Sequence, residues 1–394
     1  MIIYNNNNNN NNNVYKKALS LNSPSLASPT LTRLANRQQQ RRRRQQKQIP
    51  LTECNKKFLL SLGFKLKKKM SHIINVLEKP TIDNSIIKKD YNSYSPYLRS
   101  YENNDEIRIA IQNQDLYVLP SESFLHIQGH ITKVDDQIET TIALLNNCMA
   151  YLFSEIRYEL NGIEIDRTRH LGVTSDLKNY LSIKRNQEHL LENCGWSITD
   201  NLKLERGNFN FCVPLNLLLG FAEDYNKILL NGKHELVLLR GKDNDDVYKS
   251  TAVALTMSQL KMTISSIVWK MPHVQLSDAY KLYMFNVINK QTPLLIPFRS
   301  WDIYYNPVVP QTTTFIWSVK LAAETERPRY VIIAFKNNKK YVHCDLVDVK
   351  VYLNSEVYPY DGLNQNFSYN RYALLYDMYI NFQKSYYGCE SQPL

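Results

Sequence analysis

A short acidic segment holds the residues best suited to chemistry in this chain of 394 amino acids. Glu155 and Glu159 alternate with apolar residues on one predicted strand, and Arg157 lies between them on the same face. Positions four apart on an extended strand are separated by about 13 Å, which is too far for two ligands of one metal ion. Glu164 and Asp166 follow a turn and complete an acidic hairpin face. The pattern favours cross-strand ion pairs, and the alternative is a divalent-cation site.

The histidines and cysteines do not form a catalytic or metal-binding pattern. His126 and His130 share one strand face, but they are again about 13 Å apart. None of the eight histidines forms HExxH, HxH or a Cys₂His₂ spacing, and no two of the six cysteines form CxxC. The chain also lacks the phosphate-binding loops GxGxxG and GxxxxGK followed by Ser or Thr. We therefore predict a protein that is not an enzyme, with no catalytic residue, no metal site and no cofactor.

The positive charge of the chain is confined to its N-terminal end. The formal net charge of the whole sequence is +11. Residues 1–69 contain 15 Lys and Arg residues and one acid, Glu53, which gives +14. The remaining residues carry 33 bases and 36 acids, which gives −3. An argument from charge for nucleic-acid binding therefore applies to the first 69 residues only.

Residues 1–69 also have the composition of a disordered extension. Residues 5–13 are nine consecutive asparagines, and a run of Gln and Arg follows at 38–46. Such sequence lacks the apolar periodicity that a core needs. One interpretation is an arm that contacts nucleic-acid phosphates through Arg41, Arg42, Arg43, Arg44 and Lys47. The other is a linker, an import-like basic run, or a segment upstream of a true start at Met70.

The remainder of the chain is predicted to form many short strands and few helices. Ile107, Ile109 and Ile111 alternate with other residues at the period of a strand. Asn161-Gly162 interrupts the alternating run 153–166, and this pair is the strongest short-range signal for a β-hairpin. Further strands are predicted at 124–134 and 315–321, and helices at 218–229 and 375–386. This pattern favours an all-β sandwich or jelly roll over a parallel α/β fold.

No part of the sequence resembles a membrane-spanning or secretory segment. The longest apolar runs, such as Tyr330–Phe335, have six residues, whereas a spanning helix needs about 20. No apolar region of the kind found in signal peptides follows Tyr4. We therefore predict no membrane contact and an intracellular protein, of the cytoplasm or nucleus, that is not secreted.

Tyrosine is abundant, with 27 residues, and it is concentrated in the last third of the chain. Its side chain is large and amphipathic and loses little rotamer entropy on binding, so it is common at interfaces. Few basic residues lie among these tyrosines, which argues against a platform for stacked nucleotides. We predict that they divide between the core and a subunit interface. The predicted interface residues are Trp301, Tyr304, Tyr305, Tyr358, Tyr360, Tyr386 and Tyr387.

An ordered series of segments resembles the double jelly-roll major capsid proteins of Polinton-like, adinto-like and virophage-like DNA viruses, and related proteins of invertebrate genomes. The resemblance covers roughly Val76 to the C-terminus and leaves out residues 1–69. It rests on Leu152-Phe153-Ser154-Glu155-Ile156, Glu159-Leu160-Asn161-Gly162-Ile163, Leu219-Gly220-Phe221-Ala222-Glu223-Asp224-Tyr225, Trp269-Lys270-Met271-Pro272-His273, Phe298-Arg299-Ser300-Trp301 and Gln383-Lys384-Ser385-Tyr386-Tyr387.

The resemblance implies two tandem jelly-roll sandwiches with short helices in their loops. With the extension at 1–69, which its composition predicts to be disordered, the chain then divides into an extended arm at 70–104, a first jelly roll at 105–255 and a second at 256–394 with a C-terminal helix. The resemblance further implies a structural subunit that forms homotrimers, which tile into a shell. The protein would then belong to a virion, with DNA contacted by the basic extension. The alternative is a domesticated binding or scaffold module that does not assemble.

Overall fold

The computed structural model describes most of the chain beyond residue 84 and one short segment before it. The chain divides into two compact units, residues 1–19 with 85–394 and residues 20–84, and every described helix and strand belongs to the first unit. The described residues are 2–7, 84–112, 117–133, 142–183, 188–197, 202–204, 206–230, 232–250, 260–290, 294–320, 328–337, 340–353 and 355–388.

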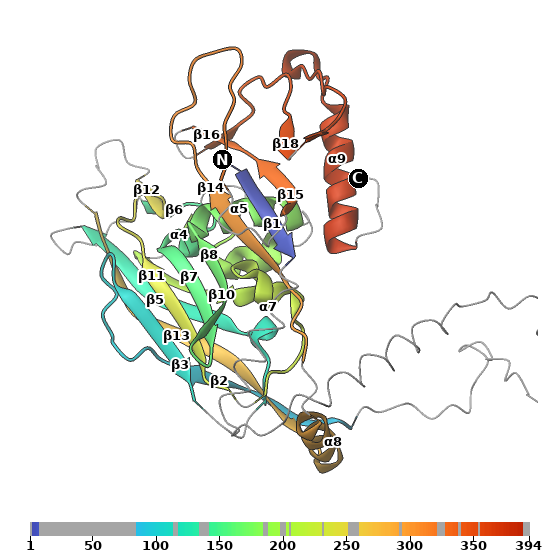
Figure 1. The fold of residues 1–394 in the computed structure, drawn as a ribbon. Helices are drawn as coiled ribbons and strands as arrows, with labels where there is room; N and C mark the ends of the chain where they lie inside the picture. The colour runs from blue at the N-terminus through green and yellow to red at the C-terminus, as the bar shows by residue number, and fades with distance from the viewer. Residues whose placement is uncertain are drawn as a thin grey trace, which may run out of the picture. The chain divides into compact units, whose positions relative to one another are not determined.

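The first part of this unit is a sandwich of two antiparallel sheets (Figure 1). One sheet has the order β10-β5-β13-β2, with β4 also paired to β13, and the other has the order β3-β11-β7-β8. The strands are β2 (Ile86–Tyr94), β3 (Glu106–Ile111), β4 (Tyr117–Val118), β5 (Phe124–Lys133), β7 (Phe153–Leu160), β8 (Ile163–Arg169), β10 (Asn208–Pro214), β11 (His234–Arg240) and β13 (Leu260–Leu276).

Alternating side chains produce the core between these two sheets. Along β5 every second residue from Leu125 to Ile131 is buried, which is the period of a strand with one apolar face. The rings of Trp269 and Tyr158, one from each sheet, meet edge to face with centroids 6.2 Å apart. Both are fully buried in one apolar cluster that spans the sandwich. The predicted strands at 107–111 and 124–134 are thus confirmed.

Short helices and small strands connect the sandwich strands, and one longer helix, α8, follows the last of them. They are η2 (Pro120–Glu122), β6 (Ile142–Leu144), α4 (Cys148–Tyr151), α5 (Leu171–Ser182), α6 (Glu188–Leu191), η4 (Glu192–Cys194), β9 (Leu202–Lys203), η5 (Leu215–Leu217), α7 (Gly220–Asp224), β12 (Tyr248–Ser250) and α8 (Asp278–Asn289). A third small sheet has the order β12-β6-β9. The single long helix predicted at 218–229 is wrong, because η5 ends before this region and α7 occupies only Gly220–Asp224 within it.

The predicted hairpin is confirmed as β7 and β8, with both turn residues at positive φ, 53° at Asn161 and 75° at Gly162. The pairing slips beside the turn, so that Glu159 faces Glu164 while Tyr158 faces Asp166. This bulge leaves one extra residue in β8 and turns Asp166 into the core. Asp166 was predicted on the acidic outer face, and that prediction is wrong for this physical reason.

β13 joins the first sandwich to the second half of the chain. This strand of 17 residues pairs with β5 on one side and with β2 on the other. β13 comes after the predicted boundary between residues 255 and 256, and its hydrogen bonds attach it to β5 and β2 of the first sandwich. The same pairing brings β2, from the predicted arm at 70–104, into the sandwich.

The second half of the chain forms a three-stranded sheet, two small hairpins and a long helix (Figure 1). Its elements are β14 (Arg299–Tyr304), β15 (Pro328–Ile333), β16 (Phe335–Asn337), β17 (Lys340–Val342), β18 (Val351–Leu353), β19 (Glu356–Tyr358), η7 (Phe367–Tyr369) and α9 (Ala373–Tyr387). α9 confirms the predicted C-terminal helix. No strand forms between 315 and 320, the described part of the predicted strand 315–321.

Strand β1 (Ile2–Asn7) is the central strand of the three-stranded sheet, between β14 and β15. It lies in the extension that was predicted to be disordered, and its backbone is instead paired on both sides. The other residues of 1–69, including Arg41 to Arg44 and Lys47, lie outside the described residues. Their predicted disorder and nucleic-acid contacts remain predictions.

A buried histidine makes the stability of the sandwich depend on pH. His234 lies in the core, with Nδ1 at 2.7 Å from the Tyr158 hydroxyl. Burial, together with a smaller effect of the neighbouring His273, lowers its pKa to about 4. In the unfolded chain the His234 imidazole takes up a proton near pH 6.5, whereas in the folded chain it stays neutral down to about pH 4.

Acidification from pH 7 to pH 4 should therefore destabilise the protein through His234 by about 3 kcal/mol. His234→Asn keeps an acceptor near the Tyr158 hydroxyl and removes the titration. The free energy of unfolding of each protein is measured in urea at both pH values. Between pH 7 and pH 4 we expect the variant to lose about 3 kcal/mol less than the wild type. Parallel pH curves would show that His234 does not stay neutral. Comparing the two proteins cancels the opposite effect of Asp166, whose carboxyl pKa burial raises to about 6.

Candidate assembly surfaces

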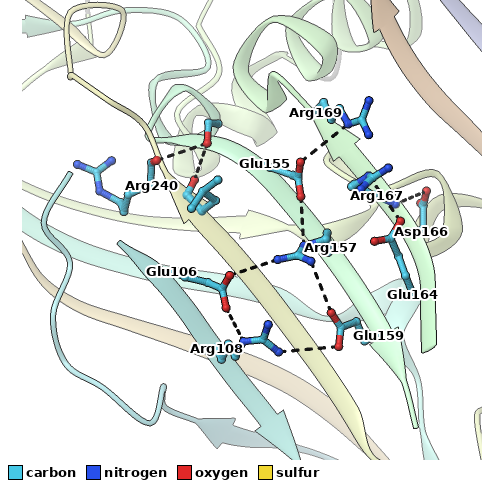
Figure 2. Close-up of polar contacts among 12 residues, drawn as sticks. Glu106, Arg108, Glu155, Arg157, Glu159, Glu164, Asp166, Arg167, Arg169 and Arg240 are labelled. Atoms are coloured by element: carbon cyan, nitrogen blue, oxygen red, sulfur yellow. Dashed lines mark hydrogen bonds and ion pairs between the residues drawn. The ribbon is translucent and has the colours of Figure 1, made fainter. Parts of the chain in front are cut away.

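The predicted acidic face proves to be a ladder of ion pairs on the outside of β3, β7 and β8 (Figure 2). Arg157 lies at its centre, with its guanidinium nitrogens 3.1 Å from Glu155, 3.3 Å from Glu106 and 4.0 Å from Glu159. Arg108 reaches Glu159 from the other side at 3.9 Å. The predicted cross-strand ion pairs are confirmed. Within the described ranges, no three His, Cys, Asp or Glu side chains are placed to hold a metal ion.

Arg157→Gln tests whether this ladder stabilises the sheet. The change leaves the three surrounding carboxylates without their shared cation, so we expect a loss of about 1 kcal/mol in the free energy of unfolding. The loss should shrink in 1 M salt, because the pairs are partly exposed. Arg167→Gln is the matched control, since Arg167 has one ion-pair partner, Glu164, at 3.5 Å. Equal losses for both variants would contradict the central role of Arg157.

A second polar cluster joins the first sandwich to the second half of the chain. Arg299 begins β14, and its backbone N–H and Nε donate to the Asp224 carboxylate at 2.7 and 2.8 Å. Its Nη1 donates to the backbone carbonyl of Tyr386 at 2.7 Å, and its guanidinium lies 3.4 Å from the centre of the Tyr386 ring. One side chain thus ties α7, β14 and α9 together. Burial opposes its charge, but the hydrogen bonds to Asp224 outweigh this effect and raise the pKa of Arg299.

The same junction has a small apolar core. Trp301 and Tyr386 are buried there with Leu177 from α5 and Ile303 from β14. Trp301 donates its indole N–H to the Tyr386 hydroxyl at 3.1 Å. The chain passes close by, since a side chain at Gly220 would collide with the backbone carbonyl of Arg299. Glycine at this position therefore allows α7 and β14 to approach each other.

The predicted interface residues fall into three groups by burial. Trp301 and Tyr386 are buried in the core of the chain itself, so the prediction that they face a second subunit is wrong for their side chains. Tyr304 and Tyr387 are half-buried. Tyr305, Tyr358 and Tyr360 are exposed, and their interface role remains a prediction.

The sequence did not single out Arg299 and Asp224 as partners, although both lie in segments that resemble the capsid family. They are 75 residues apart, and no local pattern reports such a contact. α8 was also missed, although Ser277 before Asp278 and the apolar run that comes after it are signals of a helix start. Among the helices that the structure describes, none is long and apolar enough to cross a membrane.

Comparison with known families decides the fold class. A profile of the double jelly roll-like domain matches residues 142–394, from β6 to the end of the chain. The chain belongs to the double jelly roll-like domain family. The family and the all-β fold predicted from the sequence are therefore confirmed. No curated protein matches the chain in sequence.

Several solved structures are also similar to this member of the double jelly roll-like family. VP54 of PBCV-1, fitted into a reconstruction of the virophage Sputnik, is 13% identical with a TM-score of 0.37, over 52% of this chain and 47% of that one. The Faustovirus major capsid protein is 9% identical with a TM-score of 0.36, over 58% of this chain and 62% of that one. The mavirus major capsid protein is 10% identical with a TM-score of 0.32, over 47% of this chain and 46% of that one. The chain thus spans about half the length of the solved chains it matches.

Removing the charge of Arg299 should loosen the second half of the chain. Arg299→Met leaves Asp224 half-buried without its partner, and we expect a loss of about 3–5 kcal/mol in the free energy of unfolding. Hydrogen exchange should rise first in β14 and α9 and least in β7. Adding Asp224→Asn to Arg299→Met should recover part of the loss, because no uncompensated charge remains.

The matched control for this experiment is Arg329→Met. Arg329 is exposed and lies 5.7 Å from the Tyr330 ring centre, so its loss should cost under about 1 kcal/mol. A similar loss in Arg329→Met and Arg299→Met would contradict the junction as the point that holds the second half.

Proposed function

We propose that this protein is a structural subunit of capsid type, which assembles with copies of itself into homotrimers that build a closed shell. Membership of the double jelly roll-like family supports the architecture of such a subunit. A virion, or a virion-like particle, is then its location. The role rests on surfaces for assembly and requires no catalytic residue or cofactor.

The apolar surface of the second half carries this proposal. In the described part of 294–388, five large apolar or aromatic side chains are buried and eighteen are exposed. Exposed groups of this kind include Tyr352, Tyr360, Tyr369 and Tyr376, around β18, η7 and α9. Soluble monomers rarely leave large apolar patches in water, and such patches mark sites of protein contact. A second copy of the chain would remove it from water.

The chemistry of this surface suits contact with protein better than contact with nucleic acid. Around β18 and η7 the tyrosines are accompanied by few cations, chiefly Lys350 and Arg371. Phosphate binding needs a concentration of positive charge, which is absent from this part of the sequence. Tyrosine rings bury a large area at low entropic cost, which is the property that an interface between rigid subunits needs.

Light scattering after size exclusion tests this function on the full-length chain. We expect a mass three times that of the chain, unchanged over a tenfold range of concentration. Tyr360→Asp with Tyr369→Asp should convert this trimer to monomer, because both side chains are more than 70% exposed and acquire charges at the contact. The free energy of unfolding of the isolated chain should change little, since neither ring is packed in the core.

Trp301→Ala provides the contrasting variant. It removes a buried ring, so it should cost about 3–5 kcal/mol of stability. The chains that remain folded should still form trimers. A monomeric wild-type protein at micromolar concentration would overturn the proposed function and would favour a binding module that does not assemble.

A further inference from the structure

α8 is a helix that the described part of the chain leaves uncovered. None of its 12 residues, all of them described, is buried. Five large apolar side chains on it are between 43% and 66% exposed, namely Tyr280, Leu282, Tyr283, Phe285 and Ile288. They lie on more than one side of the helix, and a helix that is apolar all round is normally buried. α8 therefore needs cover that the described part of the chain does not provide.

The apolar surface of α8 continues onto the neighbouring strand. Figure 1 shows α8 beyond the ends of β13 and β2. Ser277, just before α8, donates its backbone N–H to the carbonyl of Ser85, just before β2. Ile86 and Ile87 come directly after Ser85 and are 48% and 61% exposed. The helix and these two neighbouring residues are together called here the α8 patch.

The α8 patch is large enough to be a specific interface. If each of its seven apolar side chains offers about 200 Å² when fully exposed, the patch presents roughly 780 Å² at the exposed fractions of these side chains. A standard protein interface buries about 800 Å² on each partner. One contact over the whole patch would therefore be of ordinary size.

The charges around the patch are largely neutralised within the chain. Asp278 and Lys281 pair at 3.2 Å, and Lys88 pairs with Asp90 at the edge of β2. An amphipathic helix that binds membranes instead presents a strongly basic polar face. The helix carries an acid at its start, Asp278, whose side chain stays 92% exposed although it pairs with Lys281, and a base after its end, Lys290. An antiparallel copy of α8 would place each acidic start beside a basic end and would oppose the helix dipoles.

We propose that the α8 patch packs against the α8 patch of a second copy of this chain, antiparallel about a twofold axis, and that this contact links one trimer to another. A twofold contact uses the same patch on both partners and so requires a surface complementary to itself, which is what the charge arrangement of α8 provides. A shell needs contacts between trimers in addition to those within them. The inference rests on the proposed function and assigns to it a second, separate surface.

A paired charge variant tests this contact on the full-length protein. Leu282→Glu with Phe285→Glu places two charges in the centre of the α8 patch. We expect the trimer to persist, while the dissociation constant for association of trimers, from light scattering and negative-stain imaging, rises at least 100-fold. The matched control is Leu98→Glu with Leu190→Glu, which makes the same chemical change at side chains 73% and 80% exposed, outside both the α8 patch and the second half of the chain. It should associate as the wild type does.

Cysteine crosslinking tests the twofold arrangement. Tyr283 lies at the middle of α8, so an antiparallel pair brings it close to its own copy, whereas Ile288 near the end stays distant from its copy. Under mild oxidation, Tyr283→Cys should give a linked pair of chains that neither the wild type nor Ile288→Cys gives. Equal crosslinking by the two variants would overturn the antiparallel pairing.

The outcomes separate this inference from the proposed function. If wild-type trimers associate and the α8 variant associates equally well, the α8 contact is overturned and the trimeric subunit stands. If the variant loses the trimer itself, the placement between trimers is overturned. If α8-dependent binding to phosphatidylcholine vesicles replaces association of trimers, the patch faces lipid and the proposal is overturned. A monomeric wild type overturns both proposals together.

Discussion

The hydrogen-bonded ion pair of Arg299 and Asp224 is the constraint on which the second half of the chain depends. A half-buried ion pair loses much of its Coulomb energy to desolvation, so its value lies in geometry more than in net stability. Arg299 makes two direct bonds through its backbone N–H and Nε to one carboxylate and a third to the carbonyl of Tyr386. These bonds are satisfied in one arrangement of α7, β14 and α9, and they therefore specify that arrangement.

The two halves differ in how much of their own apolar surface they cover. The first sandwich closes a continuous core between two sheets, with the rings of Tyr158 and Trp269 in contact across it. The second half has a core of four buried residues, and α5 of the first sandwich supplies one of them, Leu177. A sheet and a helix with so small a core leave most of their apolar side chains at the surface. This asymmetry is the physical reason that the surfaces suited to assembly lie beyond the first sandwich.

The distribution of charge also separates the faces that stay in water from the faces suited to protein contact. On the outer face of β3, β7 and β8, acids and arginines alternate and neutralise one another around Arg157. The tyrosine-rich surface and α8 carry few charges. Surfaces covered by paired charges stay in water at little cost, whereas uncharged aromatic surfaces do not. The described unit therefore separates faces that remain solvated from faces that favour contact with protein.

The sequence by itself determined the local elements of this protein. Alternation at Ile107 to Ile111, the Asn161-Gly162 turn and the periodicity of α9 depend on neighbours in the chain, and they predicted the strands, the hairpin and the helix. Periodicity states that one side of an element is apolar, but it does not state what that side meets.

Only the tertiary structure decided the outcome where distant residues compete for the same space. The bulge in β8 turned Asp166 inward, the long-range pairing of β13 attached that strand to β5 and β2, and the junction with Asp224 buried Trp301 and Tyr386 while Tyr360 stayed exposed. Each of these results depends on contacts between segments tens of residues apart or more, or on a one-residue shift in register. Composition and spacing carry no record of either, because both are set when the sheets and helices pack together.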